Sequence, residues 1–359
     1  MPLSPTLAWL VDEAAASPGA DRFLAELGAR LIADGLPLAG GALSLAAPHP
    51  LIARRTWLWR SDTGAVIEAL GFAGPLGAEP VGDAGRGWLE ALAHGPAHED
   101  IVGQGAEAPS LAWIAPRPFT AIEAESLREA ARFSAAPLAA LVARATLTAA
   151  LEAYLGRRSA ARVLAGPLRR GAGETIRAAL ISADLRGFTA LSESAPPAEV
   201  IAALDAWFDR IAGAVHAFGG EVLKFLGDGM LAIFPVAGDS PGAACDAALN
   251  AVAAARAGMA HLDAARARED LPPLPFGAAV HLGEILWGNI GAADRLDFTA
   301  IGPAVNLVSR LEGLCRPLEK SVLISGAVAA EIRTPLIPLG THALRGIASP
   351  CAVFTLPEA

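Results

Sequence analysis

Hydrophobic and polar residues follow one another at helical spacing in some segments of this 359-residue chain and at period-two spacing in others. These two patterns predict where its helices and strands lie. In residues 1–118, an apolar stripe at helical spacing predicts a helix over 21–35. Period-two runs bounded by turn residues predict strands at 42–46, 56–59, 66–70 and 111–115. Residues 71–110 are rich in Gly, Ala and Pro and are expected to be loop with short elements. The pattern predicts an α/β domain over 1–118.

A helical linker is predicted between residues 119 and 173. Thr120 and Glu123 have the spacing of a capping box, in which each side chain accepts a hydrogen bond from the other's backbone N–H at a helix start. The helix is expected to continue to Gly156, with a bend at Pro137. Such a long helix is either a passive spacer or a dimerising signal helix, and the sequence leaves both interpretations open.

From about residue 174, strands and helices follow in an order typical of an α+β domain. Apolar runs predict strands at 176–183, 221–226, 230–234, 276–290 and 321–324, with two more around residue 344 and at 352–356. Helices are predicted at 197–218, 241–268 and 305–314. Two of these helices can cover one face of a mostly antiparallel sheet, so residues 174–359 are expected to form a second domain.

Composition limits the partners of such a protein. The formal net charge is −9, which argues against nucleic acid as the main partner. The three cysteines are far apart, have no metal-ligand spacing and fit a reducing cytoplasm. The N-terminus lacks the basic region of a signal peptide. The apolar stretch 138–155 carries Arg144 and Glu152, which are costly to insert into lipid, so we expect no membrane span and a cytoplasmic protein.

Two carboxylates are the first candidates for chemistry. Asp184 and Asp228 each follow an apolar, strand-like run and precede glycine-containing sequence. Side by side they can hold two divalent cations, the usual arrangement for in-line displacement at phosphorus. Asp-Gly is also a common hairpin turn, so either segment alone is equally compatible with a structural role.

A second polar cluster lies in the segment 297–310. Asn306 and Arg310 are four residues apart and therefore project from one face of a helix. The planar donor fork of Arg fits phosphate oxygens, and Asn can orient a hydroxyl or a ring oxygen. On their own, the two residues are best interpreted as a surface polar pair.

Together these segments resemble the catalytic domain of class III nucleotidyl cyclases, the adenylyl and guanylyl cyclase family. The resemblance covers about residues 174–354 and depends on three motifs in the right order. They are Asp-x-x-Gly-Phe-Thr from Asp184, Lys-x-x-Gly-Asp from Lys224 and Gly-x-x-Val-Asn-x-x-x-Arg from Gly302. It implies a ferredoxin-like cyclase fold for residues 174–359.

The resemblance also implies a role for each motif. Asp184 and Asp228, together with Leu185, are expected to bind two Mg²⁺ or Mn²⁺ ions, of which one lowers the pKa of the ribose 3′-hydroxyl and the other holds the triphosphate. Arg310 is expected to neutralise charge at the α-phosphorus, and Asn306 to position the ribose. The backbone N–H groups expected to bind phosphates at a helix start belong to Leu185, Arg186, Gly187, Phe188 and Thr189. Arg345 aligns with a basic residue that reaches the triphosphate in relatives, or is a solvated surface arginine.

Base choice is expected to depend on Lys224 and Thr299. In adenylyl members of the family, a lysine donates to a ring nitrogen of adenine, and an Asp often accepts from the exocyclic amine. Thr299 replaces that Asp, and its hydroxyl can still accept a hydrogen bond. The Lys/Thr pair resembles the bicarbonate-responsive subgroup that includes soluble adenylyl cyclases. Guanylyl members usually carry Glu and Cys at these positions, so ATP is the expected substrate.

The resemblance finally implies an assembly. In the family, the metal carboxylates come from one subunit and the base- and ribose-binding residues from the other, so a two-fold homodimer with shared sites is expected. The expected function is an adenylate cyclase that forms cyclic AMP and pyrophosphate. The alternatives are a non-catalytic cyclase-like nucleotide sensor and a guanylate cyclase. Residues 1–118 are similar in element order to a GAF-type sensor, so a small-molecule or bicarbonate regulator is expected. A module that only stabilises the dimer is the alternative.

Overall fold

The computed structural model describes residues 3–47, 52–72, 84–93, 95–105, 107–167, 169–238 and 240–357. The chain forms two compact units, Met1–Ala150 and Leu151–Ala359. The boundary between them falls inside the predicted linker 119–173, and the division into three parts stays a prediction.

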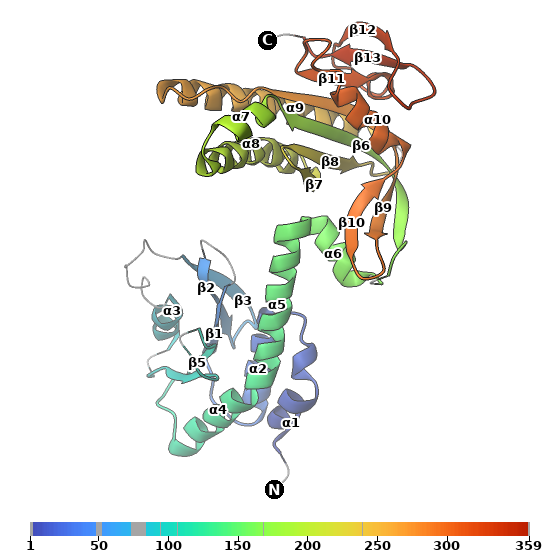
Figure 1. Ribbon diagram of the computed structural model, residues 1–359. Coiled ribbons are helices and arrows are strands. Elements are labelled where there is room, and N and C mark those ends of the chain that lie inside the picture. Colours follow the sequence, from blue (N-terminus) through green and yellow to red (C-terminus); the bar gives the residue numbers. More distant parts are fainter. Residues whose placement is uncertain are drawn as a thin grey trace. The chain divides into compact units, whose positions relative to one another are not determined.

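The first unit is built on a five-stranded antiparallel sheet in the order β3-β2-β1-β5-β4 (Figure 1). Its strands are β1 (Gly40–Ala46), β2 (Ile52–Arg60), β3 (Val66–Phe72), β4 (His98–Ile101) and β5 (Ser110–Ile114). Its helices are α1 (Pro5–Asp12), a 3-10 turn (Ala14–Ala16), α2 (Ala20–Ala33), α3 (Ala84–Leu92), α4 (Ala121–Phe133) and most of α5 (Ala135–Leu155). An N-terminal α/β domain is therefore confirmed, while its likeness to a GAF domain stays a prediction.

Helices cover both faces of this sheet. On one face, α1, α2, α4 and the start of α5 bury a large core, in which Phe23, Leu27 and Leu138 are fully inaccessible. On the other face, α3 buries Leu89. The amphipathic helix predicted over 21–35 is confirmed as α2, although Ile32 of the predicted stripe is exposed. Within the stretch predicted as loop with short elements, α3 and β4 are regular, and residues 73–83 lie outside the described residues.

The predicted capping box is present at the start of α4. The Thr120 hydroxyl accepts from the Glu123 N–H, and the Glu123 carboxylate accepts from the Thr120 N–H at 2.7 Å. The bend expected at Pro137 instead lies at Ser134, between α4 and α5. Pro137 is the third residue of α5, and the first turn of a helix tolerates proline because its N–H groups have no intrahelical partner.

One helix satisfies the length and composition of a membrane span. Among the described residues, α5 is the only helix that does so, and few of the residues in its apolar stretch are buried. A core helix of a soluble protein satisfies the same criteria. The expected absence of a membrane span therefore stays a prediction.

The second unit contains an eight-stranded sheet with the path β12-β13-β11-β9-β6-β8-β7, and β10 pairs with β9 (Figure 1). Its strands are β6 (Gly173–Leu185), β7 (Glu221–Leu226), β8 (Gly229–Pro235), β9 (Phe276–Gly291), β10 (Leu296–Ile301), β11 (Val322–Ser325), β12 (Ile337–His342) and β13 (Cys351–Thr355). Its helices are α6 (Arg157–Ala165), α7 (Phe188–Ser194), α8 (Pro197–Ala217), α9 (Pro241–Arg268), α10 (Pro303–Glu312) and α11 (Gly326–Ala329). All neighbours are antiparallel except β11 and β9.

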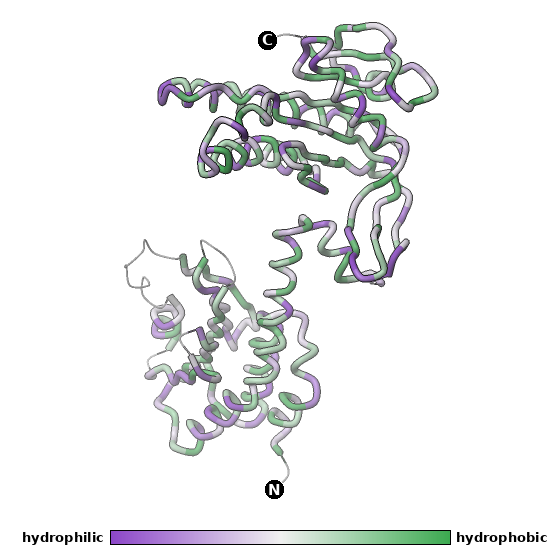
Figure 2. Tube along the Cα trace, viewed as in Figure 1, coloured by the Kyte–Doolittle hydropathy of each residue, from purple (hydrophilic) through white to green (hydrophobic). Residues whose placement is uncertain are grey.

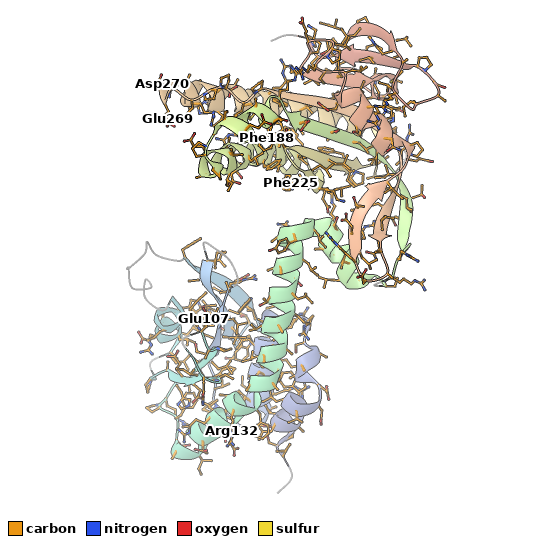
Figure 3. All side chains as sticks on the ribbon, in the orientation of Figure 1. Glu107, Arg132, Phe188, Phe225, Glu269 and Asp270 are labelled. Atoms are coloured by element: carbon orange, nitrogen blue, oxygen red, sulfur yellow. The ribbon has the colours of Figure 1, made fainter. Side chains whose placement is uncertain are left out.

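The two long helices α8 and α9 cover one face of this sheet, as expected for the α+β fold. Their core includes the buried side chains of Trp207 and Val252. Helix α10 packs against the other face through Val308 and Leu311. Figure 2 shows hydrophobic residues along the strands and hydrophilic residues at the far end of α9, where Figure 3 labels Glu269 and Asp270. The strand expected around Leu344 is wrong, because β12 ends at His342.

Candidate active site

The register of β6 and β8 brings Asp184 and Asp228 together. Asp184 is opposite Gly229 in the antiparallel pair, so Asp228 in the preceding turn lies beside it. Gly229 permits this approach, because a Cβ there would lie 3.1 Å from the Asp184 Oδ1. The indole N–H of the buried Trp207 donates to the Asp228 carbonyl at 3.0 Å and fixes the turn.

Both carboxylates are half-buried, and their proximity affects protonation. Burial, the larger cause, and the negative charge of Asp228 together raise the pKa of Asp184 to about 6. Such a shift is expected when two carboxylates share a poorly solvated site and no cation neutralises them. The pair therefore has the electrostatics of a cation site.

A third carboxylate, which the sequence analysis missed, lies near this pair. The pKa of Glu312 is raised to about 7, chiefly by burial and then by the charge of Asp184, while Arg186 opposes the rise. Glu312 is in the last turn of α10, and its Oε1 lies against Gly277 of β9, where a Cβ would be 2.7 Å away. The sequence signal was weak, because a Glu that follows a helical Arg-Leu is usually a solvated surface residue.

The donor set fits a hard divalent cation that is completed by its substrate. Among the described residues, no group of three or more His, Cys, Asp or Glu side chains is placed to hold a metal ion. Mg²⁺ typically uses one or two carboxylates together with substrate phosphates and water. Asp184 and Asp228 can meet that requirement, and Leu185 could offer only its backbone carbonyl, since its side chain is a hydrocarbon without a donor atom.

Two of the five backbone N–H groups that were expected to bind phosphate donate to carbonyl groups of the protein instead. The Arg186 N–H donates to the Pro275 carbonyl at 2.7 Å, and the Leu185 N–H donates to the Asp228 carbonyl at 3.4 Å. These two backbone donors are therefore used within the fold, which corrects the expectation that they bind phosphate. Gly187, with φ 75°, is the N-cap of α7. Phe188 and Thr189 form the first turn of α7, where helix geometry leaves N–H groups without intrahelical partners.

The Arg186 side chain is likewise used within the fold. Its guanidinium donates to the Lys320 carbonyl, and its Nε lies near Gly277. Cys315, which is buried and donates to the Ala278 carbonyl at 3.4 Å, is part of the same surroundings. Arg186 thus fastens the segment after Asp184 to the β9–β11 part of the sheet.

Lys224 and Thr299 lie on neighbouring parts of β7 and β10. The β7–β8 register shifts between Val222 and Lys224, which marks a bulge immediately before Lys224. The Lys224 ammonium forms an ion pair with Asp297 of β10. Thr299 is buried two residues further along β10, opposite Gly288. The sequence analysis missed Asp297, although its period-two spacing from Thr299 puts both on one face of the strand.

Asn306 and Arg310 lie on the exposed face of α10, opposite its buried residues Val308 and Leu311. Within the described part of the chain, no hydrogen bond or ion pair involves either side chain, and the structure does not join them to the Asp184–Asp228 pair. Arg345 is exposed in the connection between β12 and β13 and is likewise not joined to the other candidates. One chain thus brings together Asp184 with Asp228 and Lys224 with Asp297, and leaves Asn306 and Arg310 exposed to solvent.

The family match lies within the second unit. The model of the adenylate and guanylate cyclase catalytic domain matches residues 173–337. The chain is 37% identical to adenylate cyclase 1 of Rhizobium meliloti over 169 residues, which cover 45% of this chain and 25% of that protein. It is 30% identical to an adenylate cyclase of Anabaena cylindrica over 169 residues, or 46% of this chain and 32% of that protein. This chain therefore spans about a quarter to a third of these curated relatives.

A solved structure is similar over a longer stretch. The structure of a bacterial light-regulated adenylyl cyclase is 25% identical with a TM-score of 0.51, and the match covers 62% of this chain and 64% of that one.

Proposed function

Residues 173–337 belong to the class III nucleotidyl cyclase family, and from that premise we propose that the protein is an adenylate cyclase that converts ATP to 3′,5′-cyclic AMP and pyrophosphate. The observation that carries the proposal is the meeting of Asp184 and Asp228 where β6 ends and β8 begins. The charge of Asp228 helps to raise the pKa of Asp184, and a cation bound between the two carboxylates would oppose this rise by neutralising their charge.

One group of residues in the site would bind the metal ions and the phosphates. Two Mg²⁺ or Mn²⁺ ions, held by Asp184, Asp228 and the Leu185 carbonyl, would supply a lowered pKa at the ribose 3′-hydroxyl and a clamp on the triphosphate. The start of α7 would bind phosphate oxygens through Gly187, Phe188 and Thr189. The oxygen of the 3′-hydroxyl attacks the α-phosphorus, and pyrophosphate leaves.

The remaining residues orient the nucleotide and stabilise developing charge. Asn306 would hold the ribose, and Arg310 would donate to the oxygens at the α-phosphorus, where negative charge grows in the transition state. Lys224 would donate to a ring nitrogen of adenine, and Thr299 would accept from the exocyclic amine. Lys224 is the residue that favours ATP over GTP, because the corresponding ring nitrogen of guanine carries a hydrogen and cannot accept.

A homodimer follows from the exposure of Asn306 and Arg310. Neither side chain contacts the carboxylate pair of its own chain, so a second copy must supply them if they act on the same nucleotide. Two apolar side chains of the β7 hairpin support such an interface: Phe225 is 50% exposed and Leu226 is 59% exposed. Figure 3 labels Phe225 at this edge of the unit.

Activity is tested with the purified full chain, Mn²⁺ or Mg²⁺, and either ATP or GTP, with products separated by chromatography. Cyclic AMP from ATP, lost in Asp184→Asn and retained in Asp246→Asn, supports the proposal. Asp246 is an exposed residue of α9 and controls for the loss of a negative charge. Cyclic GMP alone would identify a guanylate cyclase, and no cyclic nucleotide from either substrate would favour a nucleotide sensor.

The first unit is proposed to regulate the second in the cytoplasm, with a small molecule or bicarbonate as the regulator. Its separate core, buried between the sheet and helices α1, α2, α4 and α5, supports an independently folded module. Removing residues 1–115 should change the rate of cyclic AMP formation or its response to bicarbonate. Equal rates and equal dimerisation with and without these residues would contradict regulation.

A further inference from the structure

A cavity of about 570 Å³ lies in the first unit, where α1, the end of α2 and α4 meet (Figure 1). Part of its lining is apolar and comes from the half-buried Leu7 and the buried Leu31 and Leu36. The volume is within the range of sites that hold a small molecule. None of the residues that line it has a role in the proposed nucleotide site, so the cavity calls for a separate explanation.

Two carboxylates give the cavity a negative charge. Asp34, the C-cap of α2, and Glu129 of α4 both line it, are exposed, and form no hydrogen bond or ion pair with any described residue. In the described part of the chain, no Lys, Arg or His side chain lines the cavity. The start of the short helix α1 opposes the two carboxylates with only roughly half an elementary charge. The cavity therefore favours a cation.

A buried hydroxyl without a partner is a second, independent observation. Thr6 lines the cavity and is 1% exposed, and its hydroxyl forms no hydrogen bond within the described structure. The other two hydroxyls of the lining are used, since Ser4 accepts from the Leu7 N–H at 3.3 Å and Ser126 donates to the Ile122 carbonyl at 3.2 Å. Buried polar groups normally have a partner, because burial removes the water that would bond to them. The Thr6 hydroxyl therefore indicates the polar group of a ligand.

The lining also decides which kind of cation fits. A metal ion needs several oxygen ligands, and among the described residues no group of three or more His, Cys, Asp or Glu side chains is placed to hold one. We propose that the cavity binds a small aliphatic amine, whose ammonium lies at Asp34 and Glu129 and whose hydrocarbon body packs against the leucines. An ammonium has three N–H donors, which match two carboxylates and the Thr6 hydroxyl as acceptors. Bicarbonate, an anion, is repelled here, so any response to it uses another site.

The test is calorimetric titration of the full chain with hexylammonium chloride, in the absence of nucleotide. We expect saturable binding that is about tenfold tighter than that of 1-hexanol, because hexanol has the same hydrocarbon body without the charge. Hexanoate, which has the opposite charge, should not bind. An equal concentration of MgCl₂ should not displace hexylammonium, because the metal ion gains nothing from the apolar lining.

Three variants locate the binding. The double variant Asp34→Asn with Glu129→Gln should weaken binding of hexylammonium by about tenfold, since each exposed charge pair contributes modestly. Thr6→Val keeps the shape of the side chain and should weaken binding by about threefold, without lowering the Tm of the amine-free chain. Asp12→Asn removes a negative charge from an exposed residue of α1 that does not line the cavity, and should leave binding unchanged.

Four results would overturn the proposal. Equal binding of hexylammonium and hexanol would show that the charge is not recognised, and displacement by MgCl₂ would show a diffuse attraction of cations. Unchanged affinity in the double variant would place the amine elsewhere. A lower Tm for amine-free Thr6→Val would show that the hydroxyl has a structural partner. All four leave the proposed cyclase function intact, because these measurements contain no nucleotide.

Discussion

Replacing Asp228 by Asn should make the metal-free protein more stable while it abolishes activity. In the folded chain, burial and the charge of Asp228 raise the pKa of Asp184 from 3.8 to about 6. The substitution removes that charge and puts an amide N–H, which can donate to the Asp184 carboxylate, in its place. The pKa of Asp184 should then fall, but stay above its usual range, because burial is the larger cause.

The size of the effect follows from linkage between protonation and folding. A folded-state pKa raised above the unfolded value favours folding below pH 4, and this contribution is lost as the pH rises through about 6. At 1.36 kcal/mol for each pKa unit, the whole shift corresponds to at most about 3 kcal/mol. Solvent screening of a half-buried carboxylate reduces this to about 1–2 kcal/mol, of which removal of Asp228 recovers about 1 kcal/mol.

The assay is thermal unfolding in EDTA at pH 8 and at pH 5. The transition of the second unit is the one that Mn²⁺ shifts upward in the wild-type chain, because a ligand of the folded state stabilises it by mass action. At pH 8 we expect Asp228→Asn to raise the Tm of that transition by about 2–4 °C. At pH 5 the gain should largely disappear, since Asp184 is mostly protonated there.

The control for this measurement is Asp246→Asn, which makes the same chemical change on the exposed face of α9. It should change the Tm equally little at both pH values and leave the Mn²⁺ response intact. A lower Tm for Asp228→Asn at pH 8, or an equal rise at both pH values, would refute the argument that the two carboxylates repel each other.

Three further predictions concern the site and its support. Mixing inactive Asp184→Ala and Asn306→Ala chains should recover about a quarter of wild-type activity, since half of the dimers are mixed and each has one intact shared site; no recovery would contradict the shared site. Lys224→Ala should lower kcat/KM for ATP by about 10- to 100-fold and leave that for GTP nearly unchanged, as measured by initial rates. Glu221→Ala should destabilise the second unit by about 2 kcal/mol, because the buried Glu221 carboxylate accepts from the Ser159 N–H at 2.8 Å and from its hydroxyl; an unchanged Tm would show that water replaces the carboxylate.

The sequence was sufficient to predict elements whose pattern is local and strong. The stripe of α2 and the capping box at Thr120 each follow from residues close together in the chain, whereas Asp184 and Asp228, 44 residues apart, are brought together by the β6–β8 register. The end of α4 at Ser134 could not be predicted in this way. The sequence marks Pro137 but does not say whether that proline lies in the first turn of the following helix.

The residues that support the site were beyond the reach of sequence patterns. Arg186 looks like a phosphate ligand by position, yet its backbone and side chain bond to carbonyls of residues 275 and 320, which only the folded sheet brings close. The same holds for Asp297, whose partner Lys224 is 73 residues away. Long-range partners of this kind depend on strand register, which the sequence specifies only through the whole buried face.

The turn between β7 and β8 places Lys224 and Asp228 only four residues apart on one short hairpin. In a two-fold dimer with shared sites, these residues face two different nucleotides. A substitution that tilts the hairpin would therefore disturb metal binding in one site and base recognition in the other at the same time. Double-mutant cycles that pair a hairpin residue with Thr299 or Asp184 should then be non-additive, even where the two side chains never touch.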